Sequence, residues 1–91
     1  VADIAAMKLD AITGRGSKKD FYDLFFLLQH YSIDELFSFY TEKYPHQTTF
    51  HVARSLTYFD DAELQPNPLV FDKTITWEIV KHKITSTIQA L

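Results

Sequence analysis

The sequence predicts an all-α fold of about five helices packed around an apolar, central second helix. Apolar residues recur at three- and four-residue spacing along most of the 91-residue chain, which is the pattern of helices with one buried face. Two Ser-x-x-acid patterns, at Ser17 with Asp20 and at Ser32 with Glu35, are typical capping boxes that start helices. The glycines and prolines fall between the apolar segments, and no segment has the alternation of a strand.

The first two predicted helices flank a glycine-bearing turn. Asp3 is suited to cap the first helix, which is expected to run to about Thr13 and to end at Gly14 and Gly16. Its apolar residues are expected to form one buried stripe of Ile4, Met7, Ala11 and Ile12. The second helix is expected to continue to about His30. Because it is apolar almost all round, we expect neighbours on several of its sides.

Two more helices are expected in the middle of the chain. The third begins after Ser32 and ends before Pro45. Its inward side chains are expected to be Ile33, Leu36, Phe37, Tyr40 and Tyr44. The fourth is capped by Thr48 or Thr49 and runs to about Phe59. Its inner face is expected to be Val52, Ala53, Leu56 and Phe59.

A loop and a fifth helix complete the predicted fold. Residues 60–72 contain Pro66 and Pro68, which forbid a continuous helix there. The acids of this segment, Asp60, Asp61 and Glu63, are expected to be solvated. The fifth helix begins near Thr74. It is expected to keep one apolar face of Trp77, Val80, Ile84, Ile88 and Leu91.

Composition narrows the class of protein. The formal net charge of -3 argues against tight binding of nucleic acid through overall charge, although residues 1–19 carry a local positive surplus that attracts phosphate. The absence of cysteine excludes disulfides, thiolate zinc sites and a thiol nucleophile. It also fits a reducing cytoplasm, where we expect the protein to be located. No apolar run approaches the roughly 20 residues of a membrane span, so we expect no membrane partner.

The charged residues around the glycine-bearing turn form the candidate functional site. Lys8, Arg15 and Lys19 supply cations, and Asp20 and Asp23 supply carboxylates three residues apart on one helix face. Lysine and arginine side chains bind phosphate groups, and carboxylates are ligands for Mg²⁺. The sequence therefore indicates part of a site that handles a triphosphate and a divalent cation.

Each of these residues also has a structural interpretation. Lys8 can simply extend its ammonium group to water. Arg15 can be an ordinary surface residue of a turn, and the alternative is that its flanking glycines let a ligand approach the backbone closely. Asp20 is placed to complete a capping box, whereas Asp23 interrupts an apolar helix and needs a partner or a metal. Asp20 and Asp23 either ligate magnesium or pair with Lys8 and Arg15. The residue types alone do not choose between these two interpretations.

Other polar residues support weaker hypotheses. The histidines lack the spacing or the partners of a zinc site, and the serines lack the context of a catalytic triad. The histidines in question are His30, His46, His51 and His82.

Two stretches of the chain resemble a known protein family. The run Asp3–Leu9, which contains Lys8, is followed by Arg15 and by the motif Lys19-Asp20-Phe21-Tyr22-Asp23-Leu24. In this order they closely resemble the carboxy-terminal part of the AbiEii/AbiGii family of nucleotidyltransferase toxins. The later run Tyr58–Glu63 and its proline-bearing loop also look like that family. The resemblance covers nearly the whole chain and is most specific over residues 3–28.

The resemblance implies the helical C-terminal subdomain of a larger polymerase-beta-like nucleotidyltransferase, acting in bacterial abortive infection or toxin-antitoxin systems. It implies that Lys8, Arg15 and Lys19 bind nucleotide phosphates. It also implies that Asp20 and Asp23 are the catalytic and metal-binding acids, with Asp23 favoured as the catalytic one. The implied reaction transfers a nucleotide from a Mg²⁺-bound nucleoside triphosphate to an acceptor, for which the end of a tRNA is a candidate. An antitoxin protein is an implied partner.

The chain departs from the family in one respect. Members open with a Gly-Ser motif and an Asp-x-Asp motif on a sheet, but no Asp-x-Asp pair occurs here and Gly16–Ser17 lies in a turn between predicted helices. We therefore expect residues 1–91 to be a single helical domain that is a fragment without the catalytic sheet and is inactive alone. Such a fragment is expected to expose apolar surface and to be able to dimerise. The alternatives are a helical protein-interaction module and a structural cap without catalytic role.

Overall fold

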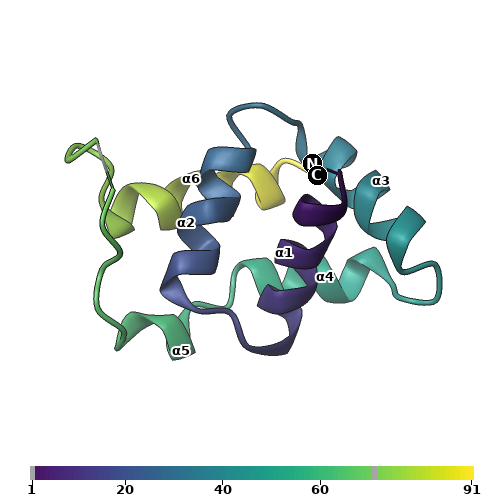
Figure 1. Cartoon of the computed structure of the whole chain (residues 1–91), viewed down its shortest axis with the longest axis horizontal. Coiled ribbons are helices and arrows are strands. Elements are labelled where there is room, and N and C mark those ends of the chain that lie inside the picture. Colours follow the sequence, from purple (N-terminus) through teal and green to yellow (C-terminus); the bar gives the residue numbers. More distant parts are fainter. Residues whose placement is uncertain (1, 71) are drawn as a thin grey trace.

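Helices make up the regular structure of the chain, as the sequence predicts (Figure 1). The computed structural model describes residues 2–70 and 72–91, apart from the side chain of Arg15. Its elements are α1 (Ala2–Arg15), α2 (Lys18–Leu27), α3 (Ile33–Lys43), α4 (Thr49–Leu56), α5 (Asp60–Glu63) and α6 (Trp77–Gln89). This described part contains no strand, and none of its helices is long and apolar enough to cross a membrane.

The helices pack around the pair formed by α1 and α2. α1 contacts α2, α3 and α4, whereas α2 contacts α1 and α6 (Figure 1). The second helix is therefore contacted on two sides, as its apolar sequence predicts. It shares the central position with α1, which has contacts with three helices.

The buried stripe of α1 differs from the predicted one. Ala5, Ala6 and Leu9 are completely buried, and Ile12 is also in the core. The expected members Ile4, Met7 and Ala11 are exposed. Two overlapping stripes of apolar side chains run along this helix. The stripe that contains the alanines faces three neighbouring helices, because the small alanine side chain lets helix backbones approach closely. Asp3 also lies in the first turn of α1 and not at its N-cap, since the helix begins at Ala2.

The two glycines of the turn have different surroundings. α1 continues through Gly14 to Arg15, two residues beyond the predicted end. A Cβ atom on Gly14 would meet nothing within 4 Å. A Cβ atom on Gly16 would lie 3.1 Å from the Phe21 ring and 3.3 Å from the Cα of Ile12. Neither glycine has a positive φ, so Gly16 is required for close packing and not for an unusual backbone conformation.

This difference predicts substitutions of opposite sign. Gly16→Ala is expected to destabilise the chain by about 1 kcal/mol, because the added methyl group pushes on backbone and on the buried Phe21 ring. Gly14→Ala is expected to stabilise it by about 0.5 kcal/mol, because alanine loses less conformational entropy in a helix. Denaturant unfolding of both variants is the measurement. Equal effects of the two changes would contradict this account of the turn.

Local capping interactions fix the starts of α2 and α3. Ser17 and Ser32 are the N-caps, and both capping boxes are complete, as the sequence predicts. α2 ends at Leu27, before the predicted His30, and α3 ends one residue before its C-cap residue Tyr44. The predicted inward residues of α3 are buried or half-buried in the core, and they are Ile33, Leu36, Phe37, Tyr40 and Tyr44.

The second half of the chain supplies an aromatic cluster that packs on α2. α4 is capped by Thr48 and ends at Leu56, so Phe59 lies beyond the helix that was predicted to include it. The Phe59 ring packs edge-on against Phe21 and Trp77, with ring centroids 5.0 and 5.7 Å apart. Trp77 opens α6, and Val80 and Ile84 continue the buried face. The predicted last member of that face, Leu91, follows the helix and is exposed.

The segment between Leu56 and Trp77 contains one element that the sequence did not predict. Asp60–Glu63 form the single helical turn α5, inside a region expected to be loop. The prolines that follow interrupt helix formation, and residues 64–70 and 72–76 contain no helix. Asp60 and Asp61 are exposed as expected.

Candidate functional site

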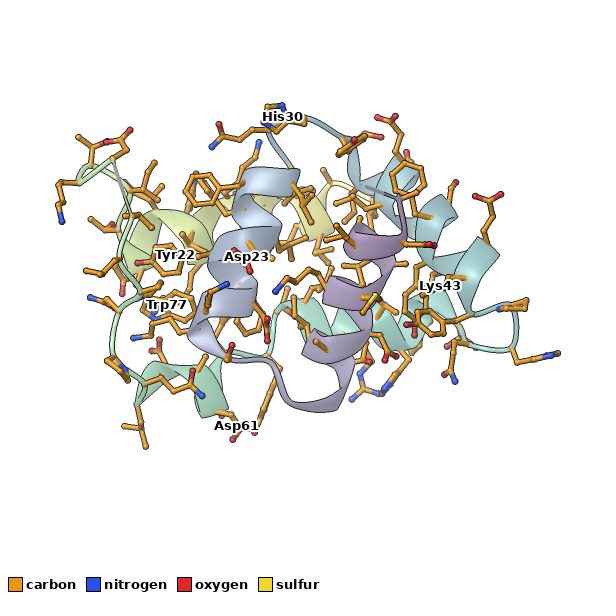
Figure 2. The ribbon with its side chains drawn as sticks, in the orientation of Figure 1. Tyr22, Asp23, His30, Lys43, Asp61 and Trp77 are labelled. Atoms are coloured by element: carbon orange, nitrogen blue, oxygen red, sulfur yellow. The ribbon has the colours of Figure 1, made fainter. Side chains whose placement is uncertain are left out.

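Four charged side chains from α1 and α2 meet on one face of the helix pair. The Nζ atom of Lys8 lies 2.8 Å from Asp23 Oδ2 and 3.2 Å from Asp20 Oδ1. The Nζ atom of Lys19 lies 3.2 Å from Asp23 Oδ2. Figure 2 shows Asp23 on the side of α2 that faces α1. The structure therefore brings together four of the five predicted site residues. Of the two arrangements that the sequence left open for the acids, the described residues show ion pairing of both with Lys8.

The fifth predicted residue, Arg15, is described only by its backbone, which ends α1. Its side chain lies outside the described part of the chain. The proposed contact of Arg15 with phosphate stays a prediction.

The two carboxylates differ in how fully they are occupied. Asp20 Oδ2 accepts hydrogen bonds from the N–H and the hydroxyl of Ser17, at 3.2 and 3.0 Å, and its Oδ1 accepts from Lys8. Both interpretations of Asp20 are therefore realised, because it completes the capping box and joins the ion pair. Asp23 Oδ2 faces both lysines, and within the described residues its Oδ1 has no polar partner. Among the described side chains, Asp23 Oδ1 is thus available as an acceptor atom.

The ion pairs keep the cluster charged at neutral pH. The hydrogen bond with Asp23 raises the pKa of Lys8, and this outweighs partial burial, which lowers it. Partial burial raises the pKa of Asp23, but hydrogen bonds and charge from Lys8 and Lys19 outweigh it and bring the net pKa below its ordinary value. Lys8 is therefore protonated and Asp23 ionised throughout the physiological range.

The Mg²⁺ that the resemblance implies fits this cluster only in part. Mg²⁺ requires near-octahedral oxygen ligands, often one or two carboxylates together with water and phosphate. Asp20 and Asp23 offer two carboxylates, but both contact the same Lys8 ammonium. Within residues 2–70 and 72–91, no group of three or more acidic, histidine or cysteine side chains is arranged to hold a metal ion. A complete magnesium shell thus needs oxygen atoms from elsewhere.

A groove adjoins the charged cluster. It has a volume of about 390 Å³ and is lined by residues of both helices and of the turn after α2: Ile4, Lys8, Lys19, Asp23, Phe26, Leu27 and His30. Its walls are largely apolar, and its charged lining residues are Lys8 of α1 and Lys19 and Asp23 of α2. The groove thus combines a charged end with apolar walls, which is the usual composition of a small-molecule site.

Sequence analysis missed the role of Lys18, the neighbour of Lys19. Lys18 is only 5% exposed, and its Nζ lies 3.2 Å from Asn67 Oδ1 and 5.0 Å from the centre of the Trp77 ring. Its backbone N–H donates to Gln65 Oε1 at 2.6 Å. Lys18 is therefore an anchor for the segment that follows α5 and does not face the candidate site. The partners are too distant in sequence for spacing to have revealed them.

Glu63 is exposed, as predicted, but it also makes contacts that the sequence did not reveal. Its carboxylate accepts a hydrogen bond from Trp77 Nε1 and pairs with Lys81 at 3.1 Å. These contacts, led by the hydrogen bond from Trp77, lower the pKa of Glu63. Glu63 thus ties α5 to α6, on the side of α2 opposite the charged cluster, where Tyr22 stacks on Trp77 (Figure 2).

Comparison with known proteins agrees with the motifs of α1 and α2. The family described as "Nucleotidyl transferase AbiEii toxin, Type IV TA system" matches residues 1–87. The uncharacterized protein aq_aa25 of Aquifex aeolicus (strain VF5) is 48% identical over 62 residues, which cover 66% of this chain and 30% of that relative. No solved structure matches the chain. The match over residues 1–87 shows that the chain belongs to the AbiEii family of nucleotidyl transferase toxins.

Proposed function

We propose that the chain supplies the helical half of a nucleoside triphosphate site in a nucleotidyltransferase. The observation that carries the proposal is the Lys8 ammonium, which is held between Asp20 and Asp23 beside an open groove. A lysine in this position keeps both its charge and its location before the phosphates arrive. Membership of the AbiEii family supports nucleotide transfer as the reaction class.

The residues of the cluster have distinct roles in this proposal. Lys8 and the exposed Lys19 bind phosphate oxygens and stabilise the charge that develops on them during transfer. Asp20 accepts hydrogen bonds from Ser17 and Lys8, and these contacts hold Lys8 and the start of α2 in place. Asp23 contacts both lysines through Oδ2, and its Oδ1 has no polar partner among the described residues. We infer that Asp23 orients Lys8 and the acceptor hydroxyl.

Magnesium and the rest of the catalytic site belong to the same proposal. Mg²⁺, when bound, offsets the negative charge of the phosphates. Asp20 and Asp23 would supply part of its ligands, and carboxylates outside residues 1–91 would supply the others. We therefore propose that the chain is inactive alone and acts within a longer protein. The match to only 30% of the length of aq_aa25 supports a longer whole.

The partner is proposed on the family description, because the phrase "Type IV TA system" supports an antitoxin. The end of a tRNA is proposed as the acceptor on the resemblance of the α1 and α2 motifs alone.

Lysine variants test the proposed phosphate site. In the complete protein, Lys8→Met is expected to lower the rate of nucleotide transfer by about 100-fold, because it removes a fixed charge at the transferring phosphates. In the 91-residue chain, the same change is expected to abolish binding of inorganic tripolyphosphate, followed by NMR titration. Lys83→Met is the matched control, since Lys83 is an exposed lysine of α6. Unchanged transfer and binding in Lys8→Met would refute the proposal, as would robust transfer by the isolated chain.

Exposed leucines favour a protein-interaction module as the second candidate function. Leu64 and Leu69 are both 95% exposed, close to the exposed acids Asp60 and Asp61. Single apolar residues on a surface are common. Two exposed leucines on an anchored segment next to acids, however, are suited to bind a partner protein through an apolar pocket that basic residues surround. If Leu64→Ser and Leu69→Ser together abolish antitoxin binding and leave nucleotide transfer unchanged, this segment is the interaction surface. If antitoxin binding is unchanged, the segment that contains Leu64 and Leu69 does not bind the antitoxin.

A further inference from the structure

The apolar part of the groove beside Lys8 is not explained by phosphate binding. On α2, Lys19, Asp23 and Phe26 follow at spacings of four and three and therefore share one face. On α1, Ile4 precedes Lys8 by four residues and lines the same groove. Phosphate groups need neither the aromatic ring of Phe26 nor the side chain of Ile4. A ligand that fills the whole groove must carry an apolar or aromatic part beside its charged part.

Phe26 is suited to contact a flat ring. It packs edge-on against the buried Phe25, with ring centroids 5.5 Å apart and an interplanar angle of 79°. Phe26 remains 38% exposed, so part of its ring is accessible to a ligand. An aromatic side chain has few rotatable bonds, so it loses little conformational entropy when a ligand stacks on it.

The groove has a cationic end and an aromatic end on adjacent turns of α2. The ammonium groups of Lys8 and Lys19 both contact Asp23, and Phe26 follows Asp23 by three residues, a rise of about 4.5 Å along the helix axis. A nucleotide carries a phosphate group and a base on one sugar, so a single ligand can contact both ends. The groove volume of about 390 Å³ lies within the usual range for small-molecule sites.

We propose that this groove seats the base of the nucleotide, with the Phe26 ring as its stacking surface and Ile4 as an apolar wall. This inference rests on the proposed function, because it takes Lys8 and Lys19 as the phosphate contacts. Phe26 stacks on the base through its ring face, so it contributes affinity for every nucleobase and does not read hydrogen-bonding groups.

The experiment compares nucleotide and tripolyphosphate binding in three variants. The affinities of the 91-residue chain for ATP, CTP, GTP, UTP and inorganic tripolyphosphate are measured by NMR titration. Phe26→Ala is expected to weaken binding of all four nucleotides by about tenfold and to leave tripolyphosphate binding unchanged. Phe26→Trp is expected to restore nucleotide affinity, because it restores a stacking ring. Phe50→Ala is the matched control, since Phe50 is a 71% exposed phenylalanine of α4 that does not line the groove.

The outcomes separate this inference from the proposed function. If Lys8→Met abolishes binding of all five ligands and Phe26→Ala changes none, the phosphate site stands and the base contact is refuted. In that case the apolar residues of the groove would be expected to contact a polypeptide segment and not a base. If Phe26→Ala weakens tripolyphosphate binding as much as nucleotide binding, Phe26 supports the fold of the site and the stacking inference is also refuted. If the wild-type chain binds none of the ligands, both the inference and the proposed function of this chain fail.

Discussion

Replacing Trp77 by alanine is expected to lower the free energy of unfolding by about 3–5 kcal/mol. Trp77 is nearly buried and contacts the rings of Phe21 and Phe59 edge-on. Tyr22 stacks on it at 6.0 Å, and its indole N–H donates to Glu63. Removing it therefore opens a cavity in the contact of α2 with α6 and leaves the Glu63 carboxylate without one donor. A domain of this length has a total stability of about 5–14 kcal/mol, so the variant is expected to be marginally folded.

Thermal and denaturant unfolding followed by circular dichroism measure this effect. Phe50→Ala is the control, because it removes an aromatic ring of similar size from an exposed position of α4. It is expected to change the free energy of unfolding by less than about 0.5 kcal/mol. A loss below about 1 kcal/mol in Trp77→Ala would show that the aromatic cluster is not the main contact of α6.

Replacing Lys18 by alanine is expected to destabilise the chain by about 1–3 kcal/mol, a large effect for a lysine. Its ammonium group donates to Asn67 Oδ1 and lies over the Trp77 ring. Without it, the Asn67 side chain and the Glu63 carbonyl lose a donor in a partly buried region. The segment that follows α5 is then held chiefly by the contacts of Gln65 and Glu63.

Two measurements distinguish Lys18 from an ordinary surface lysine. Lys18→Ala is expected to lower the midpoint of denaturant unfolding and to speed proteolytic cleavage within residues 64–70. Lys19→Ala, the neighbouring control, is expected to change stability by less than about 0.5 kcal/mol, because Lys19 is 70% exposed. Equal cleavage rates in the two variants would show that Lys18 does not hold the segment.

The helix starts were predictable because their determinants are local. Each capping box uses two residues three positions apart, and both boxes are found where the Ser-x-x-acid pattern stands. Helix ends were less predictable: α1 extends beyond Thr13, and α2 and α4 stop before His30 and Phe59. After α2 and α4 the apolar pattern continues, since Leu28 and Phe59 also pack on the core.

The charged cluster was predictable for a related reason. Lys8 and Asp20 are separated by one short turn, so two adjacent helices bring them together without help from distant parts of the chain. The sequence could not choose between ion pairing and metal binding, because carboxylates do both. The choice in this structure depends on the distance of Lys8 from Asp20 and Asp23, which is set by the packing of α1 on α2.

The sequence by itself determined the all-α class, the capped helix starts and the meeting of Lys8 with Asp20 and Asp23. Tertiary structure decided which stripe of α1 is buried, since two overlapping stripes satisfy the same helical spacing and only contacts with α2, α3 and α4 distinguish them. It also decided that Lys18 is an anchor, because its partners lie 45 to 49 residues away. Spacing within a helix reports contacts over three or four residues, whereas such distant contacts exist only after the chain has folded.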